Sequence, residues 1–218
     1  GEKGAFAREG ALFAYEALAD ALGRLFEPYI LDVVPQLLAC VADGSGGVRA
    51  AAVAASQTIM GRLSSQGAKL VLPALLDALD SEKWRTKHAA VELLGAMAYC
   101  APTQLASTLP RVVPALTEVL AHPHPRVKEK AQESLSLVGS VIRNPEVGEL
   151  VPVLLDALAN PGTKTVAALD ALARCNFEHC VDPPSLALLV PIMLRGLRER
   201  GTQPRRRAAH IVGSMCSL

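Results

Sequence analysis

The chain has 218 residues, of which 50% are hydrophobic and 20% charged, and its formal net charge is +1 at pH 7. This composition can supply a large hydrophobic core, and it excludes a disordered chain and a uniformly basic nucleic-acid-binding protein. Aromatic residues make up only 4% of the chain, whereas leucine, alanine and valine are abundant. Small aliphatic side chains suit closely packed helices, so the composition favours an all-α protein.

No apolar run reaches the roughly 18 to 20 residues that a membrane-spanning helix requires. The longest run is "LALLVPIML" at residues 186–194, and the chain does not open on a signal-peptide pattern. The five cysteines follow no disulfide-framework spacing, and the sequence has no N-x-[ST] acceptor. These features indicate reduced thiols in the cytosol or nucleus. We expect a soluble cytoplasmic protein without a membrane partner.

The first predicted element is a helix over residues 7–23, "AREGALFAYEALADALG", which has the pattern of a second hairpin helix without its first. After it, a proline-containing apolar segment recurs five times, and such a repeat decides the architecture. The segments are "VVPQLLACVAD" (33–43), "VLPALLDALDS" (71–81), "VVPALTEVLAH" (112–122), "LVPVLLDALAN" (150–160) and "LVPIMLRGLRE" (189–199). Their prolines, at positions 35, 73, 114, 152 and 191, are 38, 41, 38 and 39 residues apart.

Each repeat is predicted to be a helical hairpin. The proline-containing segment has helical apolar spacing, as in Val112, Leu116 and Val119, which a period of 3.6 residues places on one face. A short polar break follows, and then a second apolar stripe with a basic beginning. Because helix-like sequence also precedes each proline, we expect the ring to lie inside the first helix and to kink it. A kinked first helix is typical of HEAT repeats.

The predicted fold is therefore all-α: an α-solenoid of about five HEAT-type helical hairpin repeats plus a leading half repeat, with no β-sheet. One hairpin cannot bury its apolar stripe alone, so neighbouring hairpins must stack. The faces at both ends would lack a neighbour, and we expect one solenoid segment of a longer protein. The predicted boundaries are 1–28 for the half repeat and 29–66, 67–105, 106–144, 145–183 and 184–218 for the five repeats.

Three stretches of the sequence resemble a known family. They are "SEKWRTKHAAVELLGAMAYCAPTQL" (81–105), "HPRVKEKAQESLSLVGSVIRNPEV" (124–147) and "DPPSLALLVPIMLRGLRERGTQPRRRAAHIVGSMCSL" (182–218). They look like the central region of the family of general control nonderepressible protein one, and this region is similar to the HEAT domain of translation elongation factor three. The resemblance spans most of the chain and is strongest from residue 81 onward.

What the resemblance implies is a ribosome-associated scaffold. Such a scaffold would help to relay a signal from stalled or colliding ribosomes to the starvation-responsive kinase that phosphorylates initiation factor two alpha. It would work with an F-type ATP-binding cassette partner. The expected partners are thus the ribosome, through ribosomal RNA or protein, the cassette protein, and the kinase, which other parts of the parent chain would contact.

Basic residues gather at the break between the two helices of each repeat, most densely in the last one. The candidate contacts there are Arg195, Arg198, Arg200, Arg205, Arg206 and Arg207. Corresponding places in other repeats hold Arg49, Trp84, Arg85, Lys87, Arg126, Lys128, Lys130 and Lys164. A basic edge along stacked repeats would bind a phosphate backbone without reading bases. RNA or a ribosomal surface fits this prediction.

Two further interpretations of these residues stay open. The basic side chains could be merely solvated, or could pair with acids such as Glu82, Glu129 and Glu199. Trp84, the only tryptophan, could dock a partner or stack on a base, or it could cover the end of its hairpin.

The sequence offers no catalytic constellation, and we expect neither an enzyme nor a cofactor or metal. "GLRERGT" (196–202) has Thr202 where a phosphate-binding loop needs lysine. "CNFEHC" (175–180) offers Cys175, His179 and Cys180, one ligand fewer than a closed zinc site. The alternatives to the ribosomal scaffold are a generic HEAT adaptor that binds extended peptides, of the nuclear-transport or phosphatase-scaffold type, and a segment of an elongation-factor-three-like translation factor.

Overall fold

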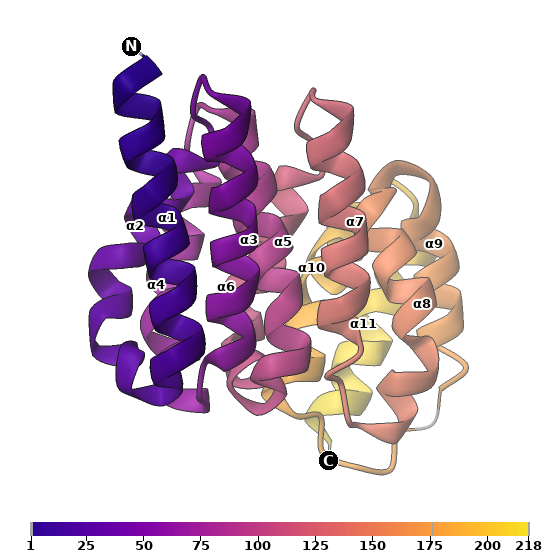
Figure 1. Ribbon diagram of the computed structural model, residues 1–218. Helices are drawn as coiled ribbons and strands as arrows, with labels where there is room; N and C mark the ends of the chain where they lie inside the picture. The colour runs from indigo at the N-terminus through magenta and orange to yellow at the C-terminus, as the bar shows by residue number, and fades with distance from the viewer. Residues whose placement is uncertain (1, 176, 218) are drawn as a thin grey trace. The chain divides into compact units, whose positions relative to one another are not determined.

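The computed structural model describes residues 2–175 and 177–217, and every regular element among them is a helix (Figure 1). The elements are α1 (Glu2–Leu22), the 3-10 helix η1 (Gly23–Tyr29), α2 (Ile30–Cys40), α3 (Gly46–Arg62), α4 (Ser65–Leu79), α5 (Trp84–Cys100), α6 (Pro102–Val119), α7 (Pro125–Gly139), α8 (Pro145–Ala159), α9 (Pro161–Leu172), α10 (Pro183–Arg198) and α11 (Thr202–Cys216). The predicted all-α HEAT-type class is confirmed. None of these helices is long and apolar enough to cross a membrane.

The five periodic prolines lie inside α2, α4, α6, α8 and α10, as the sequence predicted. Each of these helices is followed by a helix that has no proline beyond its first turn, so every proline helix is the first member of a hairpin. A proline has no backbone N–H, so the carbonyl four residues earlier loses its usual helical donor. The interior proline is tolerated because the helix keeps its other hydrogen bonds and its buried face.

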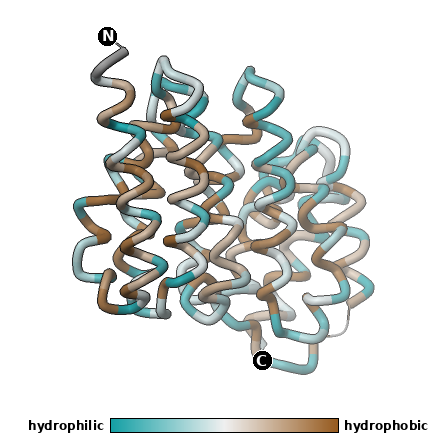
Figure 2. The backbone as a smooth tube through the Cα atoms, in the orientation of Figure 1, coloured by the Kyte–Doolittle hydropathy of each residue, from teal (hydrophilic) through white to brown (hydrophobic). Residues whose placement is uncertain are grey.

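The chain divides into two compact units. The first unit holds residues up to 105 and residues 119–134, and the second holds residues 106–118 and those from 135 on. The repeat boundaries expected from the sequence remain a prediction. Along the helices, hydrophobic and hydrophilic residues alternate, as expected when one face of each is buried (Figure 2).

In the first unit, second helices pack on second helices and first helices on first helices. α3 packs against both α1 and α5, while α2 packs against α4. The contact face of α3 is built from small residues at helical spacing, with Val48, Ala52 and Ala55 fully buried. Such side chains let two helix axes approach closely, which explains why so few aromatic residues suffice to fill the core.

Buried hydroxyl groups also join helices of the first unit. Thr86 Oγ1 on α5 donates to the Leu38 carbonyl on α2 at 3.2 Å, and Ser134 Oγ on α7 donates to the Val91 carbonyl on α5 at 2.8 Å. A Cβ on Gly95 would lie 2.7 Å from that serine oxygen, so only glycine allows this approach. These bonds satisfy polar groups that burial would otherwise penalise.

In the second unit, α8 packs on α9 and α10 on α11, and the hairpins meet through α8 with α10 and α9 with α11. Asn144 caps α8, its Oδ1 accepting from the Val147 N–H at 3.0 Å, and Asp182 caps α10 in the same way from the Ser185 N–H at 3.2 Å. These caps fix where the first helix of each hairpin begins.

Exposed apolar side chains are concentrated on α1 and η1. Phe6 and Leu25 are 72% and 74% exposed. Others on these two elements are Phe13, Leu18, Leu22 and Tyr29.

The first helix is longer at its beginning than the sequence predicted. α1 begins at Glu2, earlier than the predicted start at residue 7, and residue 23 already belongs to η1.

Candidate functional site

The six arginines of the last repeat lie around the turn between α10 and α11 in the second unit. Arg195 and Arg198 belong to the last turn of α10, Arg200 lies in the connection, and the other three belong to the beginning of α11. All six side chains are exposed. For Arg195 and Arg198 the reason is helical geometry, because α10 turns Leu188, Leu189 and Ile192 to the core. In α11 it is Ala208 and Ile211 that are buried.

Only one of these arginines has an acidic partner among the described residues. Arg207 forms an ion pair with Asp170 of α9. Arg195, Arg198, Arg200, Arg205 and Arg206 make no ion pair within the part of the chain that the structure describes, and neither does Glu199 between them. We call these five the arginine cluster. Five unpaired cations in one turn create a local positive field that the net charge of the chain does not reveal.

Trp84 opens α5 in the first unit and already has close neighbours. Its indole stacks on the His124 imidazole with ring centroids 3.9 Å apart and planes inclined by 14°. His88 meets the ring at its edge, and the Arg85 guanidinium carbon lies 4.6 Å from its centroid. Trp84 therefore holds the beginning of α5 against the turn before α7, although its side chain stays partly exposed.

The remaining basic candidates of the first unit differ in how they are held. Lys130 pairs with Glu133 at 2.6 Å. Arg85, Lys87, Arg126 and Lys128 make no ion pair within the described residues. The same is true of Glu82 and Glu129, the acids considered as neutralising partners. Lys164, in the second unit, pairs with Asp156 at 3.2 Å.

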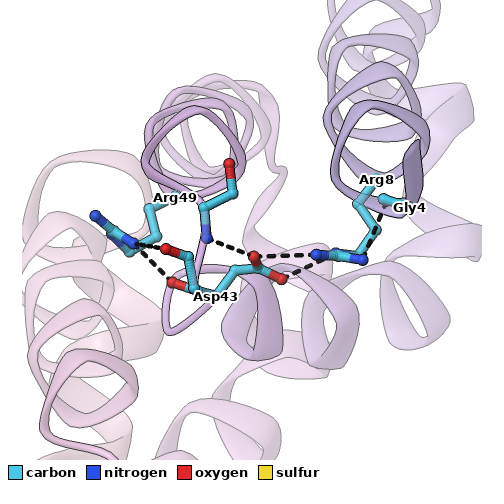
Figure 3. A network of polar contacts seen from close by, with 6 residues as sticks. Gly4, Arg8, Asp43 and Arg49 are labelled. Carbon is cyan, nitrogen blue, oxygen red and sulfur yellow. Dashed lines mark hydrogen bonds and ion pairs between the residues drawn. The ribbon is translucent and has the colours of Figure 1, made fainter. Parts of the chain in front are cut away.

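A polar network around Asp43, in the turn before α3, was not predicted (Figure 3). Arg8 of α1 donates from Nε to Asp43 Oδ2 at 2.9 Å and from Nη2 to Oδ1 at 3.1 Å, and the Ser45 N–H donates to Oδ1 at 2.8 Å. Arg49 Nη1 donates to the carbonyls of Asp43 and Gly44 at 2.8 and 2.9 Å. Arg8 first, and Ser45 second, lower the pKa of the Asp43 carboxyl.

The role of this network is structural, because it binds the α2–α3 turn to α1. The sequence contains part of the information needed to find this network, because Asp43 follows the first helix of a hairpin and Arg49 lies in the first turn of the second helix. Arg8 lies 35 residues from Asp43, so no sequence spacing could indicate that contact. Arg49, which was expected on the basic edge, thus donates hydrogen bonds to the backbone of this turn.

The pKa values of two histidines, His88 and His179, are shifted in opposite directions. Burial lowers the pKa of His88, and Lys130 and Arg126 lower it further. His179 Nδ1 lies 2.5 Å from Glu146 Oε1, and this contact raises the pKa of His179. In the CNFEHC stretch His179 therefore contacts a carboxylate, and the two form an ion pair when the imidazole is protonated. No group of three or more metal-binding side chains lies together in the described part of the chain.

Two family models of HEAT repeats match the chain, one over its N-terminal residues and one over its C-terminal residues. The model described as "EF3 N-terminal HEAT repeat" matches residues 1–135, and "Elongation factor 3/GNC1 HEAT repeat" matches residues 163–218. The first match covers more than half of the sequence. The chain belongs to the elongation factor 3/GCN1 HEAT-repeat family. The resemblance expected from the sequence is confirmed.

Within this elongation factor 3/GCN1 family, the chain is 54% identical over 211 residues to the human "Stalled ribosome sensor GCN1". It is 42% identical to the "eIF-2-alpha kinase activator GCN1" of Saccharomyces cerevisiae. Each match covers 97% of this chain and 8% of the relative. Elongation factor 3 of Gonapodya prolifera is 36% identical over 214 residues, which are 97% of this chain and 20% of that protein.

The elongation factor 3/GCN1 family member described here thus spans a small fraction of its curated relatives. Among solved structures, the designed armadillo repeat protein YIII(Dq)4CqI is similar with a TM-score of 0.43 and 16% identity, over 95% of this chain and 92% of that one.

Proposed function

We propose that this chain is a non-catalytic, cytoplasmic scaffold segment that contacts ribosomes and helps to activate the kinase acting on initiation factor two alpha. Two relatives carry the names "Stalled ribosome sensor" and "eIF-2-alpha kinase activator", which supports this role. The identity to GCN1 proteins reaches 54%, against 36% for the Gonapodya elongation factor 3. The kinase-activating branch of the family is therefore favoured over an elongation-factor segment.

The observation that carries the proposal is the arginine cluster. Five exposed guanidinium groups without an acidic partner can each contact a phosphate oxygen, and every neutralised phosphate releases counterions. Arginine contacts to phosphate carry no sequence information, so the contact would follow the backbone of ribosomal RNA or an acidic ribosomal surface. Arg126, Lys128, Arg85 and Lys87 of the first unit are secondary candidates.

The other partners follow from the family resemblance. An F-type ATP-binding cassette protein would bind the same scaffold, and the kinase would be reached through other parts of the parent protein. A HEAT array suits this task, because stacked hairpins present a long surface to several partners at once.

The test is ribosome co-sedimentation of the parent protein carrying Arg200→Glu, Arg205→Glu and Arg206→Glu. We expect binding to weaken by roughly tenfold or more, and the salt dependence between about 50 and 200 mM to become shallower, because three phosphate contacts are lost. The matched control reverses three exposed cations elsewhere, Arg24, Lys69 and Arg143, with the same change in net charge.

Equal co-sedimentation of the cluster variant and the wild type, with unchanged helical content, would overturn the contact. Equal losses in the cluster variant and its control would reduce the effect to overall charge. Binding that does not respond to salt would instead favour the peptide-binding adaptor.

A further inference from the structure

A groove with an entirely apolar lining lies within the second unit, between α6 and α10. Pro110 and Pro114 of α6 form one side. The α10 side consists of Pro183, Leu186, Ala187, Val190 and Pro191. Its volume is about 310 Å³. Four of the seven lining residues are prolines, which offer no backbone N–H to a bound molecule.

The groove continues as an apolar stripe along α10. Val190, Leu194 and Leu197 are 44%, 49% and 41% exposed. They are spaced four and three residues apart, so they lie on one face of the helix and extend it for about 10 Å. The opposite face of α10 is buried, so the exposed part of this stripe is apolar surface that the described residues of the unit leave uncovered.

Positive charge borders this surface. Arg111 follows Pro110 on α6, and Arg195 and Arg198 flank the stripe on α10. All three are exposed, and none of them forms an ion pair within the described residues. An occupant with carboxylates beside its apolar residues would complement both features.

We infer that the groove and stripe bind an amphipathic α-helix of a partner protein, with apolar residues at i, i+4 and i+7 and with aspartate or glutamate flanking them. A helix fits because its backbone hydrogen bonds are internal, whereas the groove has no polar side chain to satisfy the backbone of an extended peptide. The inference goes beyond the ribosome contact and does not depend on it.

The test selects peptides without assuming the partner. A phage-displayed library of random peptides about 16 residues long, ~24 Å when helical, is panned against the 218-residue chain. It is counter-selected against the Val190→Glu/Leu194→Glu variant. We expect the enriched peptides to share the apolar spacing and acidic flanks. A fluorescein-labelled consensus peptide should bind the groove variant about tenfold more weakly than the wild type or worse.

The matched control is Val166→Glu/Val212→Glu, because both residues are exposed apolar side chains of the same unit, on α9 and α11. It should bind the peptide like the wild type. The milder Leu194→Ala variant tests the stripe without adding a charge, and circular dichroism checks that every variant keeps its helical content.

Several outcomes would overturn the inference. These are no enrichment, a consensus that is basic or lacks the apolar spacing, or equal binding to the wild type and the groove variant. Sedimentation that shows a dimer of the chain, lost in the groove variant, would assign the surface to a second copy instead. The Arg200/Arg205/Arg206 variant should keep peptide binding, and the uncharged Leu194→Ala variant should keep ribosome binding while it weakens peptide binding, so this inference and the proposed function fail separately.

Discussion

At the residue scale, Asp43 decides the geometry of one turn. Its carboxylate accepts two bonds from Arg8 and one from the Ser45 N–H, so a single side chain connects α1 with the beginning of α3. Asp43→Ala should lower the thermal unfolding midpoint more than Asp43→Asn, because the amide retains an acceptor for one of these donors. Differential scanning calorimetry of the two variants checks this order, and equal midpoints would contradict it.

The pH dependence of the same network has a defined sign. Because the pKa of Asp43 is lowered from 3.8 in the folded chain, the unfolded chain binds more protons as the solution is acidified. The contribution of Asp43 to stability is therefore present above its unfolded pKa and is lost as pH falls through the folded value. Urea unfolding of the wild type and Asp43→Asn should converge at acidic pH.

His88 and His179 should affect the pH dependence of stability in opposite directions, because the pKa of one is lowered and that of the other is raised. The stabilisation linked to neutral His88 is present above pH 6.5 and is lost as pH falls through its lowered pKa. The stabilisation linked to protonated His179 is present below pH 6.5 and is lost as pH rises through its raised pKa. NMR titration of the imidazole Cε1 protons should place the His179 midpoint above 6.5 and the His88 midpoint below it. The reverse order would contradict both the burial of His88 and the contact between His179 and Glu146.

At the scale of elements, close approach between helices depends on glycine. A Cβ on Gly196 of α10 would lie 2.8 Å from Leu169 Cδ1 and 3.1 Å from the Ala208 Cβ. Gly196→Ala should therefore destabilise the chain by about 1–3 kcal/mol through overpacking. Gly213→Ala is the control, because open space surrounds that position in α11, and it should stabilise by about 0.5–1 kcal/mol. Denaturant unfolding measures both changes, and a neutral Gly196→Ala would disprove the close packing.

At the scale of the whole molecule, each helix is stabilised by its neighbours in the array. α3 packs between α1 and α5, whereas α1 has exposed apolar residues such as Phe6 and Phe13. Because stability in repeat proteins is a sum of local interfaces, the amides of α3 should exchange more slowly than those of α1. Hydrogen–deuterium exchange mass spectrometry measures this difference, and equal protection would contradict it.

The candidate site was only partly predictable. Clustering in the sequence identified the arginines between positions 195 and 207, because they share one turn. It could not separate Arg207, which Asp170 neutralises, from the five that remain unpaired. Trp84 was a candidate for docking or packing, and its contact with His124, 40 positions away, became visible only in the structure. The groove is lined by residues far apart in the sequence, such as Pro110 and Val190. No sequence spacing could therefore indicate that they lie together.

The sequence by itself determined the helical hairpins, the prolines within the first helices and the family. The spacing of apolar residues, the effect of proline on a helix and the polar segments between helices each depend on a few neighbouring residues. They can therefore be recognised without coordinates. Only the tertiary structure decided which charges are neutralised, which turns are bound together and where apolar surface remains uncovered. Those properties depend on distances between residues brought together by helix packing, and each distance follows from the arrangement of several side chains at once.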